Sequence, residues 1–227
     1  MNLSPILISM KTAFVSISLT FVLGLMAAKA VSAIRRPWLR GLVDGVCTLP
    51  MVLPPTVAGF FLLYVFGVKR PIGQFFLDYF GFKIAFSWEA TVLAAFVLSF
   101  PLMYRSARGA LRQVDSSLLD AARTLGRSES WIFLRVELPM ALPGVMSGAV
   151  LAFARGLGEF GATAMIAGNI QGKTRTLPLA IYSAVAAGDM EGAQDYVLIL
   201  LGVSLLALLG MGALSGGKKS LAHGEEG

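Results

Sequence analysis

Charged residues are scarce in this sequence. Only 14% of the 227 residues are Asp, Glu, Lys or Arg, whereas 56% are hydrophobic and the mean hydropathy is +0.74. Ordinary soluble domains contain about 25% charged residues. No polar stretch is long enough to form a separate soluble domain. The composition therefore excludes an ordinary soluble enzyme and predicts a single domain embedded in lipid.

Cysteine and histidine each occur only once, which removes several kinds of chemistry. Cys47 lies in an apolar run and can form no internal disulfide, so we interpret it as a small buried residue. The sequence contains no paired-histidine metal motif, nucleophile elbow or dinucleotide fingerprint. Residues 168–174 resemble a phosphate loop, but Gly-Lys-Thr follows the first glycine after three residues where four are required. We therefore expect no catalytic residue in this chain, and no metal, cofactor or ATP bound by it.

Long apolar runs are the dominant feature that the sequence does have. A membrane-spanning helix needs about 20 apolar residues at a rise of about 1.5 Å each. Five segments meet or approach this length: 12–34, 42–68, 86–104, 142–166 and 196–214. A further run, 177–187, is about half a membrane thick, so we expect an interfacial or re-entrant helix there. The first run could be a cleaved secretory signal, but its length and the following Arg35-Arg36 pair favour a retained span.

Lysine and arginine are unevenly distributed between the connections, and this predicts the orientation, because cytoplasmic loops carry an excess of both. One set of connections holds eleven: Arg35, Arg36, Arg40, Arg105, Arg108, Arg112, Arg123, Arg127, Arg135, Lys218 and Lys219. The opposite set holds six: Lys11, Lys69, Arg70, Lys83, Lys173 and Arg175. We therefore place the first set in the cytoplasm, with the N-terminus outside and a tail, 215–227, inside. Membrane lipid explains basic residues that flank apolar runs, so we expect no nucleic-acid partner.

The largest predicted cytoplasmic connection, 105–141, contains two short amphipathic helices. Ser117 is a candidate cap for the first helix, and Gly126 ends it. The apolar side of this helix is formed by four residues: Leu118, Ala121, Ala122 and Leu125. Ser128 opens the second helix, which we expect to stop before Pro139. The apolar side fits a groove on a partner protein or the lipid surface, and periodicity alone leaves both open.

The spacing of residues in this connection resembles the cytoplasmic signature of ABC importer permeases. That signature reads Glu-Ala-Ala, three residues, Gly, nine residues, Ile, one residue, Leu-Pro. The matching residues here are Asp120, Ala121, Ala122, Gly126, Val136, Leu138 and Pro139. All spacings agree, and the two departures are Asp for Glu and Val for Ile. The resemblance implies that residues 116–139, called the 116–139 element below, are a coupling element seated in a cleft of an ATP-hydrolysing subunit.

Three further segments, 53–59, 156–163 and 169–178, look like molybdate permeases, and sulfate permeases share part of them. This resemblance implies an all-α, type I ABC importer permease fold over residues 8–214, in the bacterial plasma membrane. The implied cargo is molybdate, with sulfate or tungstate as the alternative. The implied partners are a second copy of this chain, two cytoplasmic subunits that bind ATP and magnesium, and an external molybdate-binding protein. An ion-coupled secondary transporter is the other alternative, although such carriers usually have inverted repeats and more spans.

Prolines in the second span are candidates for the translocation path or its gate. Pro50, Pro54 and Pro55 remove backbone donors, so the span should be kinked or locally unwound, with Thr56 beside the break. Such irregular backbone is tolerated only against protein or a water-filled cavity. A kink that only improves packing is the alternative.

Two charges in the fourth span are the other candidates. Arg155 and Glu159 are four residues apart and costly at membrane depth, so we expect them to pair. The pair could line the path or only hold the bundle together. A stripe of small residues on the same span is assigned to helix packing alone: Gly144, Gly148, Ala152 and Gly156.

Overall fold

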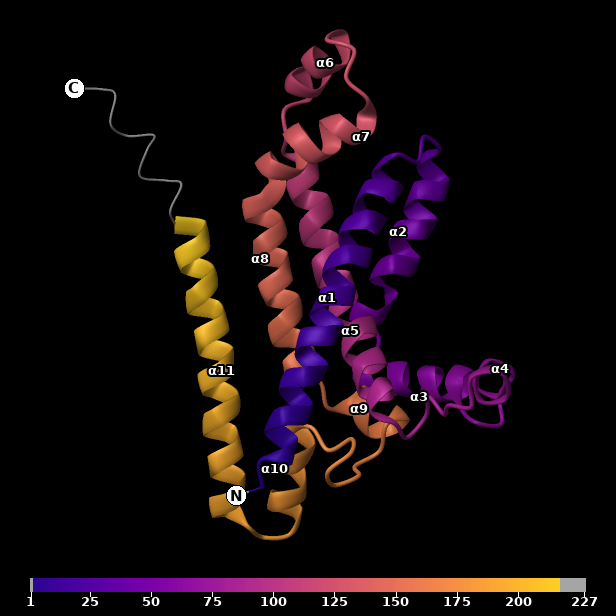
Figure 1. Cartoon of the computed structure of the whole chain (residues 1–227), viewed down its shortest axis with the longest axis vertical. Helices are drawn as coiled ribbons and strands as arrows, with labels where there is room; N and C mark the ends of the chain where they lie inside the picture. Colours follow the sequence, from indigo (N-terminus) through magenta and orange to yellow (C-terminus); the bar gives the residue numbers. More distant parts are fainter. Residues whose placement is uncertain (1, 217–227) are drawn as a thin grey trace, which may run out of the picture.

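The structure is a computed structural model that describes residues 2–216, and its regular elements over this range are helices. Four long helices run along the longest axis of the molecule (Figure 1): α1 (Ser4–Ser32), α5 (Trp88–Arg112), α8 (Leu138–Leu157) and α11 (Met190–Gly216). The short helices α6 (Ser116–Thr124) and α7 (Glu129–Ile132) lie at one end, here called the α7 end. Four others gather at the opposite, α10 end: α3 (Pro55–Phe66), α4 (Pro71–Phe80), α9 (Gly161–Ile166) and α10 (Leu177–Ala186).

The number of candidate spans agrees with the sequence. Within the described residues, four helices are long and apolar enough to cross a membrane. A fifth span results if α2 (Pro37–Val52) and α3, which are bent by 113° at their junction, count as one. This confirms the prediction of an all-helical membrane protein with about five spans. The predicted short apolar helix at 177–187 is α10.

Two predicted spans are each divided into two helices. The second, 42–68, is not one helix but the sharply bent pair α2 and α3. The fourth, expected over 142–166, begins earlier and ends at Leu157, because Gly158 ends α8 and α9 starts as a separate helix. The tail predicted at 215–227 begins inside α11, and its residues 217–227, with Lys218 and Lys219, lie outside the described residues.

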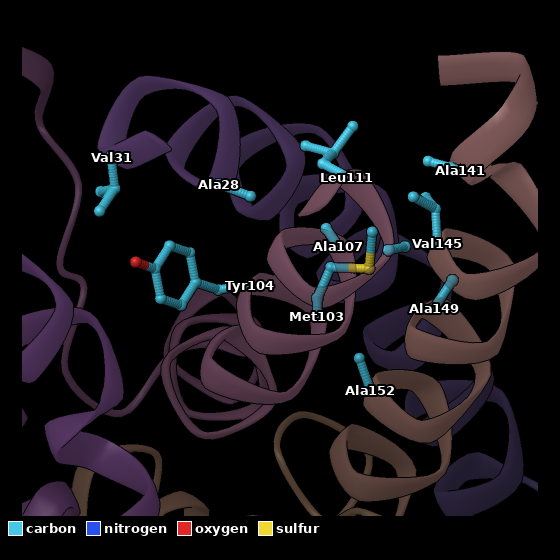
Figure 2. Packing of buried hydrophobic residues seen from close by; sticks show 11 residues of the cluster. Ala28, Val31, Met103, Tyr104, Ala107, Leu111, Ala141, Val145, Ala149 and Ala152 are labelled. Atoms are coloured by element: carbon cyan, nitrogen blue, oxygen red, sulfur yellow. The ribbon is translucent and has the colours of Figure 1, made fainter. Parts of the chain in front are cut away.

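The main core lies between α1, α5 and α8, and it is built largely from small side chains. Figure 2 shows Ala28 and Val31 on α1 facing Met103 and Tyr104 on α5. Val145 on α8 contributes to the same core from the third helix. Small residues allow helix backbones to approach closely, which drives helix association in lipid. A second cluster joins α5 to the α10 end through Ala94, Leu98, Ala162 and Ile166.

The stripe of small residues on α8 packs as predicted. A Cβ on Gly148 would lie 2.3 Å from the Ser106 Cβ, and one on Gly144 would lie 2.7 Å from the Ala110 Cβ, so both glycines permit the approach to α5. On the other side of α5, hydroxyl pairs bind it to α1. The Thr12 and Thr91 hydroxyls are 2.8 Å apart, which satisfies polar groups buried between the two helices.

Candidate functional site

The 116–139 element begins with a helix that is capped differently from the prediction. The Asp115 carboxylate accepts the Ser117 backbone N–H at 2.9 Å, so Asp115, not Ser117, is the N-cap of α6. An aspartate is an equally good cap, and the chain turns two residues earlier than the spacing suggested. The same hydrogen bond lowers the pKa of Asp115, which keeps the cap ionised.

Gly126 reverses the chain between α6 and α7, as predicted. Its φ is +73°, a left-handed conformation that glycine adopts without strain. The Gly126 N–H donates to the Arg123 carbonyl at 2.9 Å, and the Arg127 N–H donates to the Ala122 carbonyl at 3.2 Å. This is the hydrogen-bond pattern of a glycine-terminated helix. The Ser128 hydroxyl then accepts the Trp131 N–H at 3.3 Å and caps α7, which confirms the predicted start.

Arg123 fixes the two short helices relative to each other. Its guanidinium donates to the Asp120 carboxylate at 2.6 Å on α6 and to both Glu129 carboxylate oxygens, at 2.6 and 3.1 Å, on α7. These charge-assisted bonds raise the pKa of Arg123, and the bonds to Glu129 contribute more than the bond to Asp120. Asp120, the acidic residue of the signature, therefore helps to hold the turn between α6 and α7. The sequence did not reveal this contact with Arg123.

The element exposes several apolar side chains beside its charged ones, although the apolar set differs from the prediction. Leu125 is 78% exposed and Leu118 44%, with Ala121 exposed beside them. Ala122, expected on the same side, is buried, because α6 packs against α7 and the turn that follows it. Leu134 on the next turn adds a further exposed apolar side chain. Leu118 and Ala121 lie on α6, Leu125 is its C-cap residue, and Leu134 follows α7.

The second helix of the element does not stop before Pro139. It passes through a π turn, η1 (Phe133–Glu137), directly into α8, where Leu138 and Pro139 occupy the first turn. The Leu138 N–H donates to the Phe133 carbonyl, five residues back. A proline within a continuous helix removes one hydrogen bond and crowds the carbonyl four residues earlier. The wider π turn accommodates that ring, so the helix continues where the sequence predicted an end.

The predicted break in the second span is a sharp one. Pro54 and Pro55 have no N–H to donate to the carbonyls of residues 50 and 51, and α2 ends at Val52 before α3 starts at Pro55. Pro54, Pro55 and Thr56 are all exposed in the single chain. The kink predicted from the prolines is therefore confirmed, and it redirects the chain across the bundle.

The predicted ion pair at the end of the fourth span is present. The Arg155 guanidinium donates to the Glu159 carboxylate at 2.7 Å, and the other Glu159 oxygen accepts the Ala162 backbone N–H at 2.8 Å. The Glu159 side chain is 2% exposed, whereas that of Arg155 is 33% exposed. Glu159 therefore bridges the end of α8 to the start of α9, across the break between them.

The two broken spans meet each other. A Cβ on Gly161 would lie 3.1 Å from the Pro55 Cβ and 3.2 Å from the Thr56 nitrogen. A Cβ on Gly59 would lie 2.6 Å from the Ala162 Cα, so α3 and α9 are in backbone contact. The structure thus places Pro55 and Thr56 against Gly161, two residues after Glu159. Irregular backbone at this depth is stable only when buried in protein or lining a cavity.

Residues 20–216 match the model of a protein family described as the binding-protein-dependent transport system inner membrane component. The chain belongs to this family. It is a multi-pass permease of the bacterial inner membrane, and the secondary-transporter alternative is set aside.

Relatives and solved structures define the family placement further. Over 205 residues, 90% of this chain and 89% of the relative, it is 42% identical to the molybdenum transport system permease protein ModB of Escherichia coli (strain K12). It is 34% identical over 218 residues, 95% of this chain and 78% of the relative, to the sulfate transport system permease protein CysT of Salmonella typhimurium (strain LT2). The MetNI methionine ABC transporter, solved in inward-facing conformations, matches with a TM-score of 0.73 at 19% identity, over 93% of each chain. This last likeness confirms the predicted type I importer permease fold.

Two partly buried charge clusters in this permease were not predicted. Asp44 on α2 accepts the Tyr104 hydroxyl at 2.8 Å and also binds Arg108, both on α5. Lys29 on α1 binds Glu137 at the end of η1. The available signal was the presence of Lys29 and Asp44 within apolar runs, since a charge there requires a partner. Sequence spacing could not show which residue that partner was.

Proposed function

We propose that this chain forms the membrane path of an ABC importer for molybdate. The single observation that supports this cargo most strongly is the 42% identity to ModB over 90% of the chain, compared with 34% to the sulfate permease CysT. The permease fold and the paired breaks in two spans agree with a path through which an anion passes. Sulfate or tungstate is the alternative cargo.

The proposed partners supply what this chain lacks. Two cytoplasmic subunits would bind ATP and magnesium and hydrolyse the nucleotide, each docking on one 116–139 element through its exposed leucines. An external protein would bind molybdate and deliver it to the α10 end. We assign coupling to the ATPase to the seven signature positions: Asp120, Ala121, Ala122, Gly126, Val136, Leu138 and Pro139.

A second copy of the chain would complete the path. None of the sixteen residues of α2, all of them described, is buried, and α2 and α3 expose several large apolar side chains: Leu42, Val46, Leu49, Phe60 and Phe61. Pro54, Pro55 and Thr56 are exposed on the same pair of helices. A partner copy on this face would enclose these candidate path residues between the two chains, together with Arg155 and Glu159.

We propose that the α7 end faces the cytoplasm, because the connections there carry the larger share of Lys and Arg. The N-terminus then lies outside. In a Cys47→Ala background, a cysteine at Ser130 should react with an impermeant thiol reagent only after the membrane is opened. A cysteine at Gln171, at the α10 end, should react in intact cells. Labelling of both sites from one side would contradict the arrangement.

Deletion of this chain tests the cargo. High-affinity molybdate uptake should fall to background at low external concentration, while sulfate uptake persists, and the wild-type gene should restore it. Competition by unlabelled tungstate and sulfate in wild-type cells ranks the three anions. Intact molybdate uptake together with defective sulfate uptake would reassign the chain to sulfate.

A further inference from the structure

One ion pair joins the 116–139 element to the rest of the bundle. Among residues 2–216, the pair between the Lys29 ammonium and the Glu137 carboxylate is the only salt bridge that leaves this element. Lys29 belongs to the last turn of α1, and Glu137 is the last residue of η1. The Glu137 side chain is only 9% exposed, and the Lys29 nitrogen also lies 5.1 Å from the centre of the Phe133 ring. The pair therefore holds both ends of the π turn against α1.

The π turn is the weak point of an otherwise continuous helix. A turn closed by bonds to the fifth preceding residue is rare and occurs mostly as a single turn within an α-helix, often at functional sites. Pro139, two residues after the end of η1, has no N–H with which to extend the helical bonding. A force applied to α7 would therefore bend the chain at η1 unless the turn is held from outside.

The position of Glu137 determines which helices move when α7 is displaced. α7 leads through η1 into α8, while α1 packs along both α5 and α8. With Glu137 attached to Lys29, a displacement of α7 moves α8 and α1 together. Without that attachment, the displacement is absorbed by bending at η1. Partly buried ion pairs contribute little net stability, because desolvation offsets their attraction, so their clearest effect is to fix relative position.

We propose that Lys29 and Glu137 are a positioning pair that transmits movement of the docked 116–139 element to the transmembrane helices. This inference rests on the proposed function, since it assumes that the element docks on an ATP-hydrolysing subunit. Neither residue is one of the exposed leucines through which the element docks, and neither is a candidate path residue. Loss of the pair leaves docking intact and separates ATP hydrolysis from anion import.

The test measures the ATP hydrolysed per molybdate imported, in proteoliposomes that contain the permease, its ATPase and its binding protein. Glu137→Gln and Lys29→Met should each raise this ratio about fivefold or more, the lower end of typical coupling between sites. Lys29→Arg, which keeps the charge, should stay near wild type. The double exchange Lys29→Glu with Glu137→Lys should restore most of the coupling. In every variant, the ATPase should co-purify in normal amounts.

Asp44→Asn is the matched control, because Asp44 and Arg108 also form a partly buried ion pair between helices but lie outside the element. It should lower thermal stability without changing the ratio. An unchanged ratio in both Glu137→Gln and Lys29→Met would overturn the inference, as would an Asp44→Asn ratio that rises as much as theirs. Failure of the wild-type vesicles to import molybdate, or of the ATPase to co-purify with the wild type, would instead overturn the proposed function.

Discussion

Gly126→Pro is expected to abolish anion import while leaving the protein in the membrane. Gly126 has a φ of +73°, whereas proline fixes φ near −65°, and its N–H, which donates to the Arg123 carbonyl, would be lost. The chain reversal between α6 and α7 cannot form, so Arg123 no longer reaches Glu129 and the exposed leucines separate. We expect docking of the ATPase to weaken about 100-fold, or about 2.8 kcal/mol. Uptake of labelled molybdate and co-purification of the ATPase measure this.

Gly126→Asn separates the effect of the backbone from that of the side chain. Asparagine tolerates the left-handed conformation, and no atom lies within 4 Å of the position that a Cβ would occupy at Gly126. This variant should import at nearly the wild-type rate and retain the ATPase. If the proline variant also imported normally and co-purified with normal amounts of ATPase, the 116–139 element would not be the docking site.

Local chemistry explains why this turn could be predicted from the sequence. Gly126 and Ser128 act through their own backbone surroundings, which the neighbouring residues specify. The prediction of Ser117 as the cap was wrong, because Asp115, also a good capping residue, lies two positions earlier and only the path of the chain decides between them. The membrane spans could likewise be predicted from the long apolar runs, since the length of a span follows from the thickness of the bilayer.

Features that depend on distant segments could not be predicted in the same way. Ala122 and Ala121 are adjacent alanines in the signature, yet only Ala122 is buried, because α6 packs against α7 and η1. The π turn and the continued helix at Pro139 depend on how α7 meets α8. Prolines predicted the break between α2 and α3, but they set neither its 113° angle nor the contact of Gly59 with Ala162.

Glu159→Ala is expected to lower both stability and import rate strongly. The substitution removes the acceptor for the Ala162 N–H and the partner of Arg155, in a place where the carboxylate is 2% exposed. Breaking a buried ion pair in this way costs about 3–5 kcal/mol, and the partial exposure of Arg155 places the expected loss near the lower value. The melting temperature of the purified protein should fall, and the rate of molybdate import should fall about tenfold or more.

Glu159→Gln distinguishes the charge of this residue from its role in joining α8 to α9. The amide oxygen can still accept the Ala162 N–H and a bond from Arg155, so this variant should keep most of the thermal stability while the import rate falls less than in Glu159→Ala. A wild-type import rate in the glutamine variant would show that the pair only holds the break together.

Neither variant of Glu159 should change which anion is preferred. Molybdate and sulfate are both tetrahedral dianions that differ mainly in size, and a carboxylate beside Arg155 weakens any anion site there. A path that must release its cargo also has few groups that could measure size. Selection then belongs to the external binding protein, in which a misfitting anion would leave buried polar groups unpaired. A Glu159 variant that imported sulfate in preference to molybdate would show instead that the break between α8 and α9 selects the cargo.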